Sequence, residues 1–546
     1  MKAKFLKIHP NDNVIVALEN LASGTLIHVD GRELRLLESV SAKHKFLDRD
    51  VQKDEVITMY GGTVGTAKQS LRAGQVLKVE SIIHTTETFG QREANLNWDR
   101  PDLTKFQGRT FEGYHRGDGQ VGTANYWVVI PLVFCENRNV EVMKDAFLEE
   151  LGFVKPNPYK SLVRRLVAKH QSEDIPLKPL EFHEEIHETS PIFPNGDGIK
   201  FLTHQGGCGG IRQDSDMLCA LIAGYLNHPN VAGGAILSLG CQNAQIHILQ
   251  EKLKQLNPNF DKPLHIFDQQ QQGTEETLLT NAIQKTFEGL TQANENRRKP
   301  APLSKLTLGL ECGGSDGFSG ISANPMVGYT SDLVVALGGK TMLAEFPELC
   351  GVEQQLINRC TTQETADKFV ELMKSYSDAA VAVGSGFDMN PSPGNIKDGL
   401  ITDAMKSAGA AKKGGTSPVV AVLDYAEYAT EPGLNLLCTP GTDVESTTAL
   451  AGSGANIILF TTGLGTPTGN PIAPVIKISS NSALAERMPD IIDLDAGPVI
   501  TGAKTIPQMG EELLEFIIAV ASGKVKTKEQ ILGQDDFIPW KRGISL

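Results

Sequence analysis

Apolar runs that end in glycine-rich or polar loops recur through most of this chain, and a helical pattern follows each of them. In the middle of the chain the runs cover residues 126–134, 199–203, 235–239 and 264–267. This alternation of strand, loop and helix is typical of a doubly wound parallel sheet. The alternation returns after residue 304, with the strand candidates LTLGL, TMLAEF, VVAVLDY and NIILFTTG. We therefore expect two successive α/β domains.

The first part of the chain has a different pattern. It consists of short alternating runs separated by turn signals such as Asp30-Gly31 and Gly61-Gly62, which indicates a small all-β domain. A polar, irregular stretch follows. With 546 residues the chain is too long for one hydrophobic core. The predicted organisation is a β domain (1–84), a linker (85–122), a central α/β domain (123–303) and a C-terminal α/β domain (304–546).

Charge and hydropathy argue against several classes of partner. The 51 basic and 65 acidic residues give a formal net charge of −14, which disfavours nucleic acid and anionic membranes. A small anionic substrate remains compatible with a locally basic site. The N-terminal residues lack the apolar core of a signal peptide, and no run of 18 apolar residues occurs, so we expect a cytoplasmic protein. A homodimer is the default expectation for an enzyme of this kind.

The loop ECGGSDGFSGISANP at residues 311–325 follows a short apolar run. Glycine lets backbone N–H groups approach an anion closely because no Cβ is in the way. The candidate substrate-binding residues in this loop are Gly313, Gly314, Ser315 and Asp316. The alternative interpretation is an ordinary glycine-rich connection between a strand and a helix.

Three cysteines follow predicted strands of the two α/β domains: Cys208, Cys241 and Cys312. In open α/β sheets, ligands bind at the carboxyl ends of the strands. Three thiols that converge there could bind a soft metal ion or an iron–sulfur cluster. The alternative is that they are small buried residues, because free cysteine is among the most buried residue types.

The N-terminal domain offers another possible metal site. His9 and Asp12 lie in IHPNDN, His44 lies in AKHKF, and Glu80 ends a strand pattern. Histidine and carboxylate ligands suit Fe²⁺ or Mn²⁺ and leave positions open for substrate oxygens. The alternative is that these side chains are surface or core residues with local hydrogen bonds.

Two further loops carry groups that could act on an acid substrate. Tyr114, His115 and Arg116 precede GDGQVGT and offer a proton-transfer group and a carboxylate anchor. Arg212 follows HQGGCGG and could anchor a carboxylate in the same way, although both arginines could instead be solvated loop residues. The P-loop pattern is not present, because Val334 stands where the GKT at 339–341 would need a glycine, so the usual signature of phosphoryl transfer is missing.

Several long motifs resemble those of the altronate and galactarate dehydratases. They are ECGGSDGFSGISANPMVG from residue 311, PSPGN at 391–395, TPGTD at 439–443, FTTGLGTPTG at 460–469, IHPNDNVIVAL at 8–18 and AKHKF at 42–46. The resemblance extends over nearly the whole chain. GLNLLCTPGTDVESTTALAGSG and FPELCGVEQQL are closer to the altronate enzymes.

The chain also departs from the family pattern at three places. Residues 204–208 read HQGGC where HTYGC is usual, Gln242 stands where glutamate is common, and Leu464 stands where arginine is usual. The last two changes each remove a charge from a candidate substrate loop. They weaken the choice of one particular sugar acid.

The resemblance implies an SAF-like β domain followed by two Rossmann-like α/β domains. It implies a hydro-lyase that requires Fe²⁺, or Mn²⁺ in its place, and converts D-altronate to 2-dehydro-3-deoxy-D-gluconate and water in hexuronate catabolism. Galactarate or a related aldarate is the alternative substrate. A non-catalytic regulator that binds a sugar acid is the alternative function.

The resemblance also favours particular residues. The metal ligands that it favours are His9, His44 and Glu80, with Asp12 as a further ligand. Acid and base catalysis is assigned to His115, His204 and Tyr114. An iron–sulfur cluster on the three cysteines is the alternative cofactor.

Overall fold

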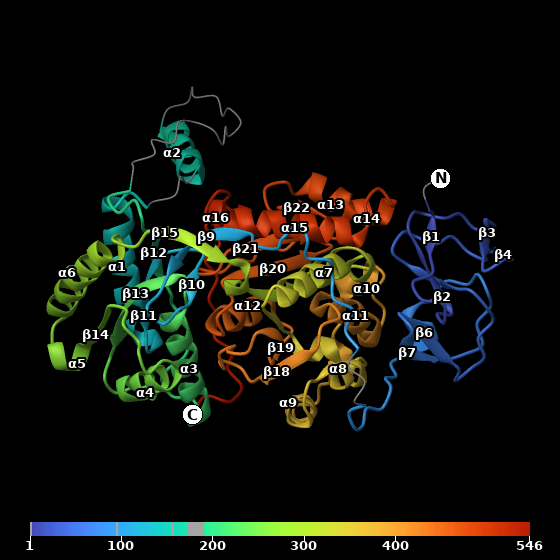
Figure 1. Ribbon diagram of the computed structural model, residues 1–546, viewed down its shortest axis with the longest axis horizontal. Helices are drawn as coiled ribbons and strands as arrows, with labels where there is room; N and C mark the ends of the chain where they lie inside the picture. The colour runs from blue at the N-terminus through green and yellow to red at the C-terminus, as the bar shows by residue number, and fades with distance from the viewer. Residues whose placement is uncertain (1–2, 94–96, 154–157, 172–190) are drawn as a thin grey trace.

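The computed structural model describes residues 3–93, 97–153, 158–171 and 191–546. Its parts follow one another along the long axis of the molecule (Figure 1), with the N-terminal β domain at one end, the C-terminal α/β domain in the middle and the central α/β domain at the other end. The predicted fold class is confirmed, because a small all-β domain precedes two domains with parallel sheets. No helix in the described part of the chain is long and apolar enough to cross a membrane.

The N-terminal domain consists of short antiparallel strands joined by tight turns. They are β1 (Phe5–Leu6), β2 (Val14–Ala17), β3 (Leu26–Val29), β4 (Arg32–Arg35), β5 (Lys45–Leu47), β6 (Val56–Met59), β7 (Gly62–Ala67) and β8 (Ile82–Ile83), with the 3₁₀ turn η1 (Val79–Ser81) before β8. The sheets have the orders β1-β2-β5, β3-β4 and β6-β7-β8. The predicted turn at Asp30 and Gly31 joins β3 to β4 with φ of 49° and 75°, the geometry of a two-residue hairpin turn.

A small antiparallel sheet combines two strands from the segment that the sequence predicted to be a linker with one strand from residues 298–302. It contains β9 (Thr110–His115), β10 (Val121–Gly122) and β15 (Arg298–Pro302), in the order β10-β9-β15. The polar composition of this segment hides two strands whose apolar positions, Phe111 and Val121, are buried in the core of the C-terminal domain. The pairing of β9 with β15 joins the residues on either side of the central domain.

The central domain is built on a four-stranded parallel sheet with the order β12-β11-β13-β14. Its strands are β11 (Tyr126–Pro131), β12 (Gly198–Phe201), β13 (Val231–Ser238) and β14 (Leu264–Asp268). Its helices are α1 (Asn137–Glu150), α2 (Pro158–Gln171), α3 (Arg212–Asn227), α4 (Ile246–Leu256), α5 (Gln269–Gln272) and α6 (Glu275–Ala293), with η2 (Phe134–Glu136) before α1. β11 is buried along its whole length, as expected for a strand covered on both faces.

The C-terminal domain is built on a seven-stranded sheet with the order β18-β19-β17-β16-β20-β21-β22, in which all pairs are parallel. Its strands are β16 (Thr307–Cys312), β17 (Lys340–Leu343), β18 (Val419–Leu423), β19 (Gly433–Leu437), β20 (Ile457–Thr462), β21 (Val475–Ser479) and β22 (Leu494–Asp495). The strand order reverses between β16 and β20. Such a switch point opens a crevice at the carboxyl edge of the sheet, where ligands bind.

Helices and short turns connect these strands. They are α7 (Ala323–Ala336), α8 (Glu353–Arg359), α9 (Gln363–Ala382), α10 (Pro393–Lys397), α11 (Asp403–Ala410), α12 (Asp443–Gly452), α13 (Ser482–Arg487), α14 (Gly497–Thr501), α15 (Ile506–Ala521) and α16 (Lys528–Leu532), with the 3₁₀ turns η3 (Leu303–Lys305), η4 (Ser319–Ile321), η5 (Phe346–Leu349), η6 (Phe387–Met389) and η7 (Ala411–Gly414). Their sequences carry start signals. For example, Thr505 and Gln508 form a reciprocal capping box at the start of α15.

The N-terminal domain docks on the carboxyl edge of the C-terminal sheet. Lys45 donates a hydrogen bond to the carbonyl of Gly399 at 2.6 Å. Lys43 forms ion pairs with Asp316 at 3.0 Å and with Asp398 at 2.8 Å. The AKHKF motif of the β domain therefore reaches the same edge of the sheet as the glycine-rich loop that follows β16.

Candidate active site

Three motif loops meet at the switch point between β16 and β20. The N–H of Gly463, in the TTGLGTP loop, donates to the carbonyl of Gly314 at 3.0 Å. Asn395 Nδ2, in the PSPGN loop, donates to the carbonyl of Ser315 at 2.7 Å. The loops that carry the family-like motifs therefore form one structure around residues 313–316, although the chain separates them widely.

Beside these loops lies a cluster of charged side chains, which we call the lysine cluster: Cys312, Glu345, Glu348, Lys406 and Lys413. Lys413 Nζ lies 2.8 Å from Cys312 Sγ and 3.0 Å from Glu345 Oε2. Lys406 Nζ lies 2.5 Å from Glu348 Oε1. The end of β16 supplies Cys312, the residues after β17 supply Glu345, η5 supplies Glu348, and α11 and η7 supply the two lysines. All but Lys406 are fully buried.

The lysine cluster balances its own charge. Burial lowers the pKa of the Lys413 ammonium, but Cys312 and Glu345 outweigh burial and hold that pKa well above its usual value. Burial raises the pKa of the Glu348 carboxyl, yet Lys406 and Lys413 together bring that pKa below its usual value. Two ammonium groups therefore face two glutamate carboxyl groups, and the cluster needs no further cation.

Glu311 and Glu345 show signs of strain next to this cluster. Glu345 has φ of 67°, a left-handed conformation that is costly for residues other than glycine. Glu311 Oε2 accepts a hydrogen bond from Ser446 Oγ at 2.6 Å, whereas the Oε1 atoms of both glutamates are buried without a partner in the described part of the chain. Burial, followed by repulsion from Glu345, raises the pKa of Glu311 well above its usual value. Backbone strain and unpartnered buried oxygens together are typical of functional sites.

Asp443 lies against Gly313 in the first turn of α12. A Cβ at Gly313 would lie 2.1 Å from Asp443 Oδ2, so this close approach requires glycine. Burial, followed by repulsion from Glu345 and Glu348, raises the pKa of Asp443 to about 7. The side chain is only partly buried. Asp443 is therefore a titratable carboxyl group that reaches solvent next to the lysine cluster, and its pKa suits proton transfer near neutral pH.

Asp316 anchors the glycine-rich loop. Its Oδ1 accepts hydrogen bonds from Ser319 Oγ at 2.9 Å and Ser480 Oγ at 2.8 Å, and its Oδ2 lies 3.0 Å from Lys43 Nζ. Lys45 is buried nearby, and burial lowers its pKa to about 7 although Asp316 opposes the shift. Asp316 thus has a full set of partners, and it joins the loop to the N-terminal domain.

The chain matches family models in three successive parts. The model for the D-galactarate/altronate dehydratase C-terminal domain matches residues 303–545, that for the second domain of D-galactarate dehydratase/altronate hydrolase matches 113–294, and that for the altronate/galactarate dehydratase SAF domain matches 3–85. An altronate dehydratase of Escherichia coli (strain K12) is 34% identical over 531 residues, 96% of this chain and 97% of that protein. The chain belongs to the altronate and galactarate dehydratase family.

Other members of this family of hydro-lyases are similar over nearly the same length. An altronate dehydratase of Bacillus subtilis (strain 168) is 31% identical, with 96% of each chain covered. A galactarate dehydratase (L-threo-forming) of Escherichia coli (strain K12) is also 31% identical, over 96% of this chain and 94% of that protein. The sequence identity to this chain is thus nearly the same for the altronate dehydratases and the galactarate dehydratase.

The structure does not bring together the four metal ligands that the sequence predicted in the N-terminal domain. Asp12 accepts a hydrogen bond from the N–H of His9 at 3.0 Å and closes a local turn. His44 Nε2 lies 3.1 Å from the carbonyl oxygen of Lys397, and Glu80 is exposed in η1. Local hydrogen bonding, the alternative that the sequence left open, accounts for Asp12, His9 and His44.

The three predicted cysteine ligands are also separated. Cys312 belongs to the lysine cluster of the C-terminal domain, whereas Cys208 and Cys241 follow β12 and β13 of the central domain. Their neighbour there is Cys135, whose pKa is raised by burial and then by Cys208 and Cys241. The sequence missed Cys135 because it lies in the short turn η2 and not in a glycine-rich loop.

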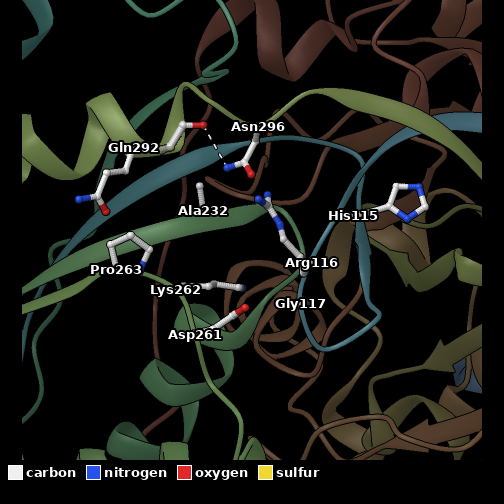
Figure 2. A pocket seen from close by; sticks show the side chains of 10 residues that line it. His115, Arg116, Gly117, Ala232, Asp261, Lys262, Pro263, Gln292 and Asn296 are labelled. Atoms are coloured by element: carbon white, nitrogen blue, oxygen red, sulfur yellow. Dashed lines mark hydrogen bonds between the residues drawn. The ribbon is translucent and has the colours of Figure 1, made fainter.

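Tyr114 and His115 end β9 and Arg116 follows it, and Figure 2 shows His115 and Arg116 among the residues that line a cavity. His115 and Arg116 line a cavity of about 220 Å³ beside Ala232, at the amino-terminal edge of the central sheet. Arg116 Nε donates to the carbonyl of Pro229 at 2.7 Å, and burial lowers the pKa of its guanidinium to about 10. The lining of this cavity contains no residue of the motif loops, so the predicted acid–base pair and carboxylate anchor are not part of the candidate site.

His204 and Arg212 also have local roles in the central domain. His204 Nε2 lies 2.6 Å from the carbonyl oxygen of Pro131, and its Nδ1 accepts the N–H of Gly206 at 3.1 Å. Burial lowers the pKa of His204 to about 4, so a neutral imidazole holds this loop with both ring nitrogens. Arg212 is exposed and donates to Asn243 Oδ1 at 2.6 Å.

The predicted substrate-binding residues of the glycine-rich loop are the ones that lie at the candidate site, and their contact with substrate stays a prediction. The sequence missed the acidic and basic groups beside them. Glu345 and Glu348 carried a signal, because they lie near the end of the predicted strand TMLAEF and just after it. Lys406 and Lys413 lie in a segment with neither a strand pattern nor a glycine-rich loop. Only the tertiary structure brings them to the site.

Proposed function

We propose that this protein removes water from a six-carbon sugar acid in a metal-dependent reaction, with D-altronate as substrate and 2-dehydro-3-deoxy-D-gluconate as product. The observation that carries the proposal is the meeting of the motif loops beside the lysine cluster and Asp443. Ammonium groups next to a glycine-rich loop suit the carboxylate and hydroxyl oxygens of a sugar acid.

The reaction requires that a proton leave C2 and that the hydroxyl group leave C3. In the proposed mechanism, ionised Asp443 takes the C2 proton and then gives it to the departing C3 hydroxyl, which leaves as water. Lys406, the partly accessible lysine of the cluster, binds the substrate carboxylate and stabilises the negative charge that grows there as the C2–H bond breaks. The resulting enol then becomes the 2-keto acid.

The metal in this proposal is Fe²⁺ or Mn²⁺, as the family resemblance implies. The chemistry that such an ion supplies when bound is Lewis-acid polarisation of the substrate carboxylate and a neighbouring hydroxyl group. Two sets of three potential ligands come together within the described part of the chain: Cys312, Glu345 and Glu348, and His84, Cys350 and Asp403. The first set already has lysine partners. The second contains the imidazole, thiol and carboxylate groups that transition-metal ions bind.

Altronate is favoured over galactarate by the charge of the substrate loops. Altronate has one carboxylate and galactarate has two. Leu464, which stands where the family usually has arginine, lies at the candidate site, and its N–H donates to the carbonyl of Gly314 at 3.0 Å. Without that arginine, a second carboxylate would lack a cationic partner in this loop. A monocarboxylate fits the loop better.

The proposal is tested by measuring the release of 2-keto acid, as the semicarbazone, from D-altronate, galactarate and glucarate with and without Fe²⁺. We expect the wild type to convert D-altronate, and to do so faster with Fe²⁺ than without it. Asp443→Asn should convert D-altronate far more slowly than the wild type. Faster conversion of galactarate would favour the second substrate. Tight binding of a sugar acid without release of keto acid would favour a regulator and overturn the proposed reaction.

A further inference from the structure

A second cluster joins the end of the N-terminal domain to the C-terminal domain, and we call it the histidine cluster: His84, Cys350 and Asp403. His84 follows β8, Cys350 follows η5 and Asp403 begins α11. One potential ligand atom of each residue lies within 4.8 Å of those of the other two. His84 Nδ1 and Asp403 Oδ1 form a close ion pair.

Asp403 lacks the partners that a buried carboxylate needs. Its side chain is 2% exposed, and neither of its oxygens has a hydrogen bond of ordinary geometry from a donor in the described residues. The contact with His84 is an ion pair without that geometry, because His84 Nδ1 is unpartnered by the same criterion. Leaving a buried carboxylate in this state is costly. The cluster is therefore incomplete without a further positive group.

The surroundings add negative charge and no compensating cation. Glu353 is 5% exposed, and burial, with a contribution from Asp403, raises its pKa to about 7. Asp388 acts on the same group, since it contributes to the raised pKa of both His84 and Cys350. Among the residues that the structure describes, no lysine or arginine forms an ion pair with Asp403, Glu353 or Asp388. Within the described residues, His84 pairs with Asp403, and the acidic side chains around this ion pair outnumber the cationic ones.

We propose that His84, Cys350 and Asp403 bind a divalent transition-metal ion. A set of one imidazole, one thiolate and one carboxylate suits Fe²⁺, Co²⁺ or Zn²⁺ and not Mg²⁺ or Ca²⁺, which prefer oxygen ligands. A bound ion keeps a coordinating thiol deprotonated and supplies the positive charge that the buried Asp403 lacks. The His84 side chain is 31% exposed, so solvent or substrate oxygens can complete the coordination sphere.

The histidine cluster adjoins the lysine cluster through shared elements. Cys350 comes two residues after Glu348 in the same segment, and Asp403 precedes Lys406 by about one turn of α11. Asn390 Oδ1, close in sequence to Asp388, accepts a hydrogen bond from Lys406 at 2.7 Å. A metal ion in the histidine cluster would thus lie near the lysine that holds the substrate carboxylate. This role in the reaction rests on the proposed function, whereas the binding of the ion does not.

Metal binding is tested by titrating the reduced full-length protein with Co²⁺ in the absence of oxygen and recording the absorption spectrum. Co²⁺ bound to a thiolate has an intense ligand-to-metal charge-transfer band. We expect this band in the wild type and its loss in Cys350→Ser. His84→Gln and Asp403→Asn should weaken Co²⁺ binding by more than the ~10–100-fold that follows loss of a partner outside the coordination sphere.

Two matched cysteine variants serve as controls. Cys241→Ser removes a thiol from the central domain and Cys312→Ser removes one from the lysine cluster, and both should keep the band that Cys350→Ser loses. Absence of the band in the wild type, or its survival in Cys350→Ser, overturns the proposal. Thermal unfolding shows whether each variant is folded, and His84→Gln, at a partly exposed position, is the second test if Asp403→Asn does not fold. Co²⁺ binding without turnover of any sugar acid would keep this site and reject the proposed function. Metal-dependent turnover of D-altronate by a wild type that shows no Co²⁺–thiolate band would reject this site and keep the proposed function.

Discussion

The lysine cluster and the histidine cluster contain similar ligand atoms but differ in their charge balance. Each has a cysteine close to buried carboxyl groups. In the lysine cluster, Lys413 lies 2.8 Å from the thiol and Lys406 lies 2.5 Å from a carboxylate. In the histidine cluster, His84 pairs with Asp403, and Glu353 and Asp388 are further acidic side chains near this ion pair. A cysteine with nearby carboxyl groups can therefore have different roles, and the number of cationic side chains around it determines the role.

This difference separates the binding of a substrate anion from the binding of a metal ion. A cluster that carries its own ammonium groups can bind a substrate anion without a metal ion. A cluster with an excess of negative charge and an unpartnered buried carboxylate is suited to bind a cation. Because residues 345–350 and α11 contribute to both clusters, a sugar acid could contact both at once. The following predictions test this division.

The largest effect is expected for Asp443→Asn, which removes the proposed proton-transfer group beside the lysine cluster. We expect kcat to fall by ~10²–10⁴-fold. The wild-type kcat/KM should rise as the pH increases through about 7, because ionised Asp443 is the active form, and the variant should lose this rise. Glu445→Gln, in the same turn of α12, is the matched control and should retain activity. Normal activity in Asp443→Asn would move the chemistry away from this cluster.

A second large effect is expected for Lys413→Met, which makes the lysine cluster resemble the histidine cluster. Glu345 and Glu348 would remain buried with one ammonium group fewer, and we expect the free energy of unfolding to fall by about 3–5 kcal/mol. Denaturant unfolding measures this change. Lys412→Met, at the exposed neighbouring position, should change stability by no more than ~0.5 kcal/mol. Equal effects of the two substitutions would show that the charge balance of the cluster contributes little.

A smaller effect is expected at Lys45, a buried lysine outside both clusters. Its pKa in the folded protein is lowered from 10.5 to about 7, so above pH 7 the unfolded chain binds more protons than the folded protein. Stability should therefore rise between pH 7 and 10.5, by no more than ~1.4 kcal/mol per pH unit. Lys45→Met should flatten this rise, and Lys43→Met, whose lysine has a raised pKa, should keep it. Thermal unfolding from pH 7 to 9 makes the comparison, and an unchanged slope in Lys45→Met would show that Lys45 remains charged.

The sequence predicted the parts of the fold that depend on local patterns. Apolar runs such as 306–310 and 456–463 mark β16 and β20, because a buried parallel strand is apolar along its length. The turn signal at Asp30 and Gly31 marks a hairpin. By contrast, strand β9 was missed because its buried face packs against a domain that lies far away in the sequence.

The sequence predicted the part of the candidate site in which a close backbone approach requires glycine. Gly313 could be identified from the glycine-rich pattern of its loop, and the structure shows that this loop approaches Asp443 closely. Lys406, Lys413 and Asp403 could not, since each lies in an ordinary helical or turn pattern and acquires its role through contacts across the fold. Histidines were predicted as site residues only because an imidazole group can bind a metal ion or transfer a proton. His204 has both ring nitrogens occupied by backbone groups, whereas His84, which no sequence motif marked, pairs with Asp403.

The smallest effect is expected for His115→Ala, at the amino-terminal edge of the central sheet. His115 is exposed, and its Nε2 lies 3.1 Å from the carbonyl oxygen of Pro300, so its loss should change stability by no more than ~0.5 kcal/mol. Turnover of sugar acid and the Co²⁺ charge-transfer band should both be unchanged, because no motif loop and neither cluster lines the cavity beside it. A strong loss of activity with unchanged stability and Co²⁺ binding would place a catalytic group at this edge. It would also mean that the lysine cluster and the histidine cluster are not sufficient for the reaction.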